Sequence, residues 1–315
     1  MSLDPVLQQI LDQIPLPSGD LDWGKLRAES ASLIALLNGP EGPVVVADVQ
    51  TLEIDGKGGP VPLRIIRPET EPRGTLHFVH GGAWALGSVD HIEGVVRRLA
   101  KELSMVVVAS GYRLAPEAPF PAGFEDVMTA AAWVLDHAAE LGGSTLPVAI
   151  GGESAGANLA AAAAIALRGG DHPRFDAQLL FFPAVDLRDG ANSLPSRRAD
   201  ADPTLPATTF PQIFSTYCGE NDRGDPRISP MAAESLADLP PVLLVVLSVD
   251  PLRDEAVAYA ERLKSSGVPV DVMEFDNLTH GFLGFAGLVP AAAAAVSDIA
   301  DRFSMMLARL PHQTK

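Results

Sequence analysis

The sequence predicts an α/β fold built on a mostly parallel, eight-stranded sheet with helices on both faces. Eight short apolar runs rich in β-branched or aromatic residues follow one another along the chain, and helical patterns separate most of the later ones. Strands that are apolar almost throughout are typical of parallel sheets covered on both faces. The expected strands are 44–54, 61–68, 75–82, 105–113, 147–152, 177–186, 241–250 and 270–278.

We expect one domain spanning residues 1–315, because the sequence contains no disordered linker long enough to separate two domains. Proline collects in a few short stretches that read as loops and turns rather than as a domain boundary. The expected helices between the later strands are 91–103, 123–141, 155–167 and 253–266.

Two segments lie outside the strand–helix alternation. Residues 1–38 contain two helical patterns, and a proline-broken segment contains another near 208–217. In open α/β sheets the ligand lies outside the carboxyl ends of the strands. We therefore expect about 1–42 and about 188–222 to form a small helical cap there. The catalytic core would be the rest of the chain, about 43–187 and about 223–315.

Composition excludes several classes of partner. The formal net charge of −17 disfavours nucleic acid, since phosphate binding needs a basic surface. No apolar run is long enough to span a bilayer, so no membrane partner is expected. Cys218 is the only cysteine, and the first residues carry no secretory pattern. We therefore expect a cytoplasmic protein.

The stretch "GGESAGAN" places Ser154 between an apolar strand pattern and an alanine-rich helical pattern. Gly152 and Gly156 complete a G-x-S-x-G motif, which by itself is weak and is also compatible with an ordinary tight turn. The strand–serine–helix context favours a nucleophile elbow, where small residues permit a strained backbone and the helix N-terminus lies beside the hydroxyl.

A serine hydroxyl needs a base to remove its proton. Of seven histidines, only His280 lies in a loop directly after a predicted strand, the last one. The others read as structural or solvated residues: His77, His80, His91, His137, His172 and His312.

The base needs a carboxylate to orient it, and Asp250 ends the strand pattern at 241–250. Asp186 also follows a strand, Asp254 lies a turn into a helix, and Asp276 is expected within its strand. Position favours Asp250, because the chain order Ser154, Asp250, His280 is that of an α/β hydrolase.

A tetrahedral intermediate needs hydrogen-bond donors aimed at its oxyanion. Gly81 and Gly82 follow the strand at 75–82, and no side chain blocks their amides. Together with the amide of Ala155 they are the predicted oxyanion hole. A simple glycine turn would explain the glycines but not why they should face Ser154. We expect His80 to brace this loop rather than to transfer protons.

These motifs give the chain its resemblance to the hormone-sensitive-lipase-like esterases of the α/β hydrolase superfamily. It extends from about residue 45 to the end, and the N-terminal helices match more loosely. The stretches that carry it are "HGGAWALGS", "YRLAPEAPFPA", "GGESAGANLAAA", "DPLRDEAVAYAERLKSSGVPV" and "THGF".

The resemblance implies a carboxylesterase with Ser154 as nucleophile, His280 as base and Asp250 as its partner. It also implies oxyanion donors at Gly81, Gly82 and Ala155. The chain departs from the family pattern at three positions. Ala83 replaces a third glycine, Glu153 replaces a more frequent aspartate, and Ser248 replaces a frequent glutamate.

Two further groups of residues lie near the predicted site. Polar side chains in the proline-fixed loop "YRLAPEAPFPA" are expected to form a structural brace: Tyr112, Arg113 and Glu117. Aromatic side chains are candidates for the substrate pocket, with core packing as an equal alternative: Trp84, Phe210, Phe214 and Tyr217.

The resulting hypothesis is hydrolysis of a small-molecule ester of short to medium acyl chain length, with no metal and no cofactor. An amidase or an acyltransferase with the same residues is the alternative, and a ligand receptor that does not catalyse is a third. If the final strand forms the sheet edge, it is a candidate for pairing with its copy in a homodimer; a solvent-exposed edge is the other interpretation.

Overall fold

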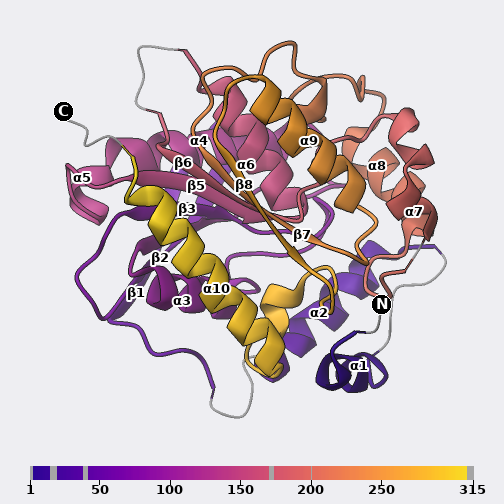
Figure 1. The fold of residues 1–315 in the computed structure, drawn as a ribbon, viewed down its shortest axis with the longest axis horizontal. Coiled ribbons are helices and arrows are strands. Elements are labelled where there is room, and N and C mark those ends of the chain that lie inside the picture. Colours follow the sequence, from indigo (N-terminus) through magenta and orange to yellow (C-terminus); the bar gives the residue numbers. More distant parts are fainter. Residues whose placement is uncertain (1–2, 15–19, 38–41, 170–173, 200, 311–315) are drawn as a thin grey trace.

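A computed structural model describes residues 3–14, 20–37, 42–169, 174–199 and 201–310. Within them, eight strands form one sheet in the order β1-β2-β4-β3-β5-β6-β7-β8 (Figure 1). β2 is antiparallel to β1 and β4, and all the other neighbours are parallel. The predicted fold class is confirmed. The strands are β1 (Asp48–Gly56), β2 (Gly59–Arg67), β3 (Thr75–Val79), β4 (Val106–Ser110), β5 (Val148–Glu153), β6 (Ala177–Phe181), β7 (Val242–Leu247) and β8 (Val270–Phe275).

Helices cover both faces of the sheet because strand side chains alternate between two hydrophobic clusters. In β4, Val106 and Val108 belong to one cluster, and Val107 and Ala109 to the other. The first cluster includes buried residues of α4 (Ala122–Asp136), α6 (Ala155–Ala166) and α9 (Arg253–Ser265). The second includes buried residues of α3 (Glu93–Leu103) and α10 (Pro290–Leu307).

The predicted helix over 123–141 is divided in two. α4 ends at Asp136, and α5 (Ala138–Leu141) follows after His137. The His137 ring bonds the Trp133 carbonyl through Nδ1 at 2.8 Å and stacks on the Trp133 ring. The His137 side chain thus hydrogen-bonds to a carbonyl in the last turn of α4, next to the residue at which that helix ends.

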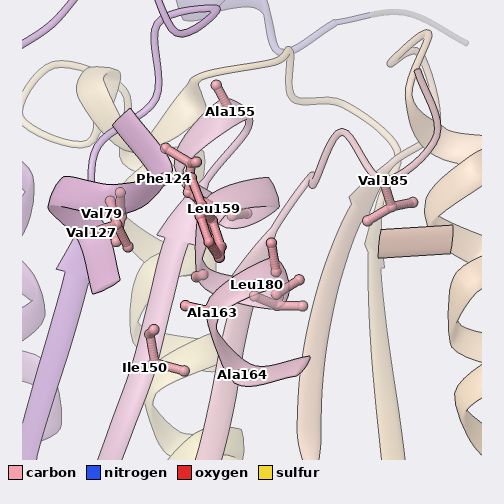
Figure 2. Packing of buried hydrophobic residues seen from close by; sticks show 14 of the residues in the cluster. Val79, Phe124, Val127, Ile150, Ala155, Leu159, Ala163, Ala164, Leu180 and Val185 are labelled. Carbon is pink, nitrogen blue, oxygen red and sulfur yellow. The ribbon is translucent and has the colours of Figure 1, made fainter. Parts of the chain in front are cut away.

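The alanine-rich helix α6 packs very closely on the middle of the sheet. Figure 2 shows Leu159 and Ala163 of α6 among Ile150 of β5 and Leu180 of β6. At the helix start, a Cβ on Gly156 would lie 2.1 Å from the Val79 carbonyl oxygen. Only glycine permits this approach, which fixes the position at which β5 turns into α6.

Gly156→Ala should therefore destabilise the protein by roughly 3 kcal/mol, because the added methyl group would overlap backbone atoms that cannot move aside. The measurement is the free energy of unfolding in denaturant. Gly190→Ala is the matched control, since nothing lies within 4 Å of a Cβ built at that position. Equal losses in the two variants would contradict the close-packing argument.

The remaining helices gather at the end of the sheet opposite α5 (Figure 1). We call the described parts of 1–42 and 188–222 the cap segments; that they act as a cap stays a prediction. Two bonds join them: Leu21 N–H to Gln212 Oε1 at 2.7 Å, and Gln212 Nε2 to the Leu21 carbonyl at 2.8 Å. Their helices are α1 (Pro5–Leu11), α2 (Trp23–Leu37), α7 (Pro195–Ala199) and α8 (Phe210–Cys218).

The sheet ends at β1 on one side and at β8 on the other. The final strand is thus an edge strand, as a pairing surface would require, and a homodimer through it stays a prediction. Among the described residues, no helix has both the length and the apolar character needed to cross a membrane.

Candidate active site

Ser154 occupies the sharp turn between β5 and α6. Its backbone has φ of 53° and ψ of −119°, a conformation that residues other than glycine rarely adopt. Such a conformation costs roughly 1–3 kcal/mol and persists only where surrounding contacts impose it. Here the Ser154 N–H donates to the Phe181 carbonyl at 2.9 Å, and α6 begins at the next residue.

The structure brings Ser154, His280 and Asp250 into one chain of hydrogen bonds. His280 Nε2 lies 2.8 Å from Ser154 Oγ, and His280 Nδ1 lies 2.7 Å from Asp250 Oδ2. Asp250 Oδ1 accepts from the Leu252 N–H at 2.8 Å, and the side chain is almost fully buried. The three residues follow β5, β7 and β8, so parallel strands deliver them to the same edge of the sheet.

The surroundings of His280 strengthen it as a base. Burial by itself would lower the pKa of the imidazole, but the charge and hydrogen bond of Asp250 act in the opposite direction. The charges of Asp202 and Glu153 add to this effect, and the net result is a pKa raised above the usual 6.5. The same carboxylates would stabilise an imidazolium formed during proton transfer.

The loop after β3 faces Ser154. A Cβ built on Gly81 would lie 3.3 Å from Ser154 Cβ and 3.0 Å from the Glu153 carbonyl oxygen, so the loop runs directly past the elbow. Burial raises the pKa of Glu153, while the charge of His280 and the nearby Gly81 backbone oppose this rise. The assignment of the Gly81 amide as an oxyanion donor stays a prediction.

The amides of Gly82, Ala83 and Ala155 donate to no acceptor in the part of the chain that the structure describes. The Ala83 amide was not among the oxyanion donors predicted from the sequence. Its φ of 54° is positive, like that of Ser154. The sequence feature that could have suggested Ala83 as a donor is its place in the run Gly81–Gly82–Ala83, which follows a strand.

His80 braces this loop. Its Nδ1 lies 2.7 Å from the Gly81 carbonyl, and its ring stacks on Tyr112 with centroids 4.3 Å apart. The Tyr112 hydroxyl donates to the His80 carbonyl at 3.1 Å. Burial lowers the pKa of His80 to about 4, so its ring is neutral at physiological pH. These contacts suit a structural residue and not a proton carrier.

Arg27 of α2 connects a cap segment to two loops of the core. Its Nε donates to the Ala85 carbonyl at 2.8 Å, and one Nη donates to the Ala115 carbonyl at 2.7 Å. It also forms a bidentate pair with Glu117, both distances being 2.8 Å. The hydrogen bond from Arg27 lowers the pKa of Glu117 to about 2. In the same proline-fixed loop, Arg113 pairs with the buried Asp126 at 2.9 Å.

The four aromatic candidates for the substrate pocket form two pairs, and each is at most 3% exposed. Trp84 and Tyr217 stack with ring centroids 4.3 Å apart. Phe210 and Phe214 lie 5.3 Å apart, and the Arg197 guanidinium covers both rings at 5.1 and 5.3 Å. Arg197 in turn pairs with the buried Glu255 of α9. Contact of these rings with substrate stays a prediction.

The competing aspartates have other partners. Asp186 pairs with Arg188 at 2.7 Å, and Asp254 accepts from the Ser196 N–H at 2.9 Å. Asp276 was expected within its strand, but β8 ends at Phe275 and the Asp276 carboxylate accepts from Ser248.

A cavity of about 540 Å³ lies at the opposite edge of the sheet, where residues such as Pro147, Asp176 and Pro241 precede β5, β6 and β7. None of the predicted site residues lines it. Among the described residues, no group of three or more His, Cys, Asp or Glu side chains is arranged to hold a metal ion.

A serine elbow on a mostly parallel sheet, with a base and an acid on loops after later strands, defines an α/β hydrolase. A family model described as the alpha/beta hydrolase fold matches residues 76–284. The chain therefore belongs to the α/β hydrolase family, and its resemblance to the hormone-sensitive-lipase-like esterases is confirmed.

Known relatives cover nearly the whole chain. Esterase LipI of Mycobacterium tuberculosis is 38% identical over 303 residues, 94% of this chain and 92% of that protein. Ethyl acetate hydrolase of Pseudomonas putida is 30% identical and covers 93% of this chain and 95% of its own length. The solved structure of an esterase from the archaeon Pyrobaculum calidifontis has a TM-score of 0.86 at 36% identity, covering 97% of this chain and 99% of its own.

Proposed function

We propose that this protein is a carboxylesterase that hydrolyses small esters through an acyl-enzyme intermediate on Ser154. The observation that carries the proposal is the continuous hydrogen-bond chain from Ser154 Oγ through His280 to the buried Asp250. A complete chain of this kind argues against a receptor that only binds its ligand. The esterase names of the relatives support the same class of reaction.

In the acylation half, Ser154 Oγ attacks the ester carbonyl carbon while its proton passes to His280 Nε2. The carbonyl oxygen becomes an oxyanion, and the unpaired amides of Gly82, Ala83 and Ala155 are the donors we assign to it. Asp250 holds the ring through Nδ1 and stabilises the imidazolium. The C–O bond to the alcohol then breaks, and His280 protonates the departing alcohol oxygen.

In the deacylation half, water replaces the alcohol. His280 takes a proton from the water, whose oxygen attacks the acyl carbon, and the second tetrahedral intermediate uses the same amides. Its collapse releases the carboxylic acid and returns the proton from His280 to Ser154 Oγ. Each step uses only protein groups and water.

We propose short to medium acyl chains as substrates. Trp84 directly follows the predicted oxyanion loop in the chain and stacks on Tyr217, and we expect this buried pair to limit the length of acyl chain that fits. The name of the Pseudomonas putida relative specifies an ester with a two-carbon acyl group. The sequence contains no strongly amphipathic lid segment of the kind expected for a lipase that acts at oil–water surfaces.

The experiment is a series of p-nitrophenyl esters from acetate to palmitate, run beside p-nitroanilides of the same acids. We expect kcat/KM to peak between about two and eight carbons and the anilides to be far slower, because p-nitrophenoxide leaves readily whereas the anilide nitrogen must be protonated as the C–N bond breaks. Equal or faster anilide turnover would replace the esterase assignment by an amidase. A maximum at palmitate would refute the chain-length proposal.

A further inference from the structure

The main chain at His280 is held by two side chains from a distant part of the sequence. His280 lies in the loop between β8 and the short 3₁₀ helix Phe282–Phe285, outside any regular element. Its N–H donates to Asp202 Oδ2 at 2.6 Å, and its carbonyl accepts from Thr204 Oγ1 at 3.0 Å. Asp202 and Thr204 belong to a cap segment, 78 and 76 positions earlier in the chain.

Asp202 and Thr204 also fix one another. Asp202 Oδ1 accepts from the Thr204 N–H at 2.9 Å and from its hydroxyl at 2.7 Å. The hydroxyl has one proton, so it divides its donation between Asp202 and the His280 carbonyl. The Asp202 side chain is 1% exposed. A carboxylate so deeply buried needs the hydrogen bonds it receives, and these bonds determine its orientation.

His280 is faced by three carboxylates from three elements: Asp250 after β7, Glu153 at the end of β5 and Asp202 in the cap segment. Its other close neighbours are the Ser154 hydroxyl and the Phe182 ring, whose centroid lies 4.7 Å from that of the imidazole. Burial raises the pKa of Asp202, and the charge of Asp250 raises it further.

We propose that Asp202 and Thr204 are positioning residues for His280, holding its main chain from the cap segment while the Asp202 carboxylate adds a negative charge beside the imidazole. This inference rests on the proposed function, because it takes His280 as the base. Asp250 fixes the ring through Nδ1, and Asp202 and Thr204 fix the backbone from which the ring projects.

The expected effect on catalysis follows from two requirements, the position of the imidazole and the stabilisation of its charged form. The imidazole must reach Ser154 and Asp250 at once, and a displacement of about 1 Å costs about 100-fold in rate. Proton transfer also creates an imidazolium, which a second carboxylate stabilises in the transition state. Loss of the Asp202–Thr204 contacts should therefore lower kcat more than it raises KM.

The test compares Asp202→Ala, Asp202→Asn and Thr204→Val in the full-length protein. Thr209→Val is the matched control, since Thr209 is a buried threonine of the same segment whose hydroxyl, among the described residues, bonds only the Pro206 carbonyl, at 2.7 Å. The readouts are kcat and KM for p-nitrophenyl acetate, the pH profile of kcat/KM and the thermal midpoint. Asn keeps an oxygen for the His280 N–H but removes the charge, so it separates charge from geometry.

We expect Asp202→Ala to lower kcat about 10- to 100-fold with KM changed less than about threefold. Thr204→Val should lose less, and Thr209→Val should match the wild type. In Asp202→Asn the acid limb of kcat/KM should move to lower pH by about 0.5 unit or more, because one charge that favours imidazolium is gone.

A kcat within twofold of wild type in Asp202→Ala, or a loss confined to KM, would overturn the inference. So would an unchanged acid limb in Asp202→Asn. If Asp202→Ala does not fold, Asp202→Asn and Thr204→Val test the inference by the same criteria of kcat, KM and the acid limb. Ser154→Ala separates the two proposals: activity that survives in it contradicts the proposed function, whereas an inactive Ser154→Ala beside normal Asp202 variants contradicts only the role of Asp202.

Discussion

Ser154→Ala should lower kcat for p-nitrophenyl acetate by about 10⁴-fold or more, because it removes the hydroxyl that lies within hydrogen-bond distance of His280 Nε2. Stability should change little. The alanine keeps the strained backbone of the elbow, and only one hydrogen bond, to His280 Nε2, is lost. The measurement is steady-state hydrolysis together with mass spectrometry of protein treated with a phosphonate ester, which should add to the wild type alone.

Ser215→Ala is the control for this variant. Ser215 is exposed on α8, and its hydroxyl donates to the Gln212 carbonyl of the same helix. It should retain wild-type kcat and accept the phosphonate at Ser154. Phosphonate attached to any other residue, or hydrolysis by Ser154→Ala within tenfold of wild type, would show that the nucleophile is misassigned.

Asp250→Asn should lower kcat by about 10⁴-fold with KM nearly unchanged. The amide can preserve the shape of the site and the bond from the Leu252 N–H, but its NH₂ group would present a donor to His280 Nδ1. The ring would then carry its proton on Nε2 and could not accept one from Ser154. The measurement is kcat and KM for the ester.

Asp254→Asn is the matched control, because Asp254 lies four positions from Asp250 and bonds Ser196 instead of His280. It should retain normal kinetics. A loss below tenfold in Asp250→Asn would mean that another carboxylate orients the ring, and Asp202 would then be the first one to examine.

The fold was predictable because its determinants are local and repeated. Each buried strand is a short apolar run, and each helix after β4 has its own pattern, so alternation alone indicated a parallel sheet. Ser154, Asp250 and His280 were found for the same reason, since each directly follows a recognisable strand. The break at His137 was missed because a side chain that bonds a carbonyl four residues earlier leaves no trace in hydrophobic periodicity.

Contacts between loops could not be predicted from the sequence. Nothing in the proline-broken stretch around Asp202 and Thr204 marks them as partners of a residue more than seventy positions later. Their contact depends on how the cap segment and the loop after β8 come together.

Arg27 has a consequence for attempts to shorten the protein. A chain that began at β1 would retain Ser154, Asp250 and His280, and judged by its sequence motifs alone it would be a complete enzyme. It would nevertheless lose the single guanidinium that joins the carbonyls of Ala85 and Ala115, one residue from each of the loops flanking the elbow. α2 therefore links two loops of the core although it contributes no reacting group, and a shortened chain would have to hold these loops without it.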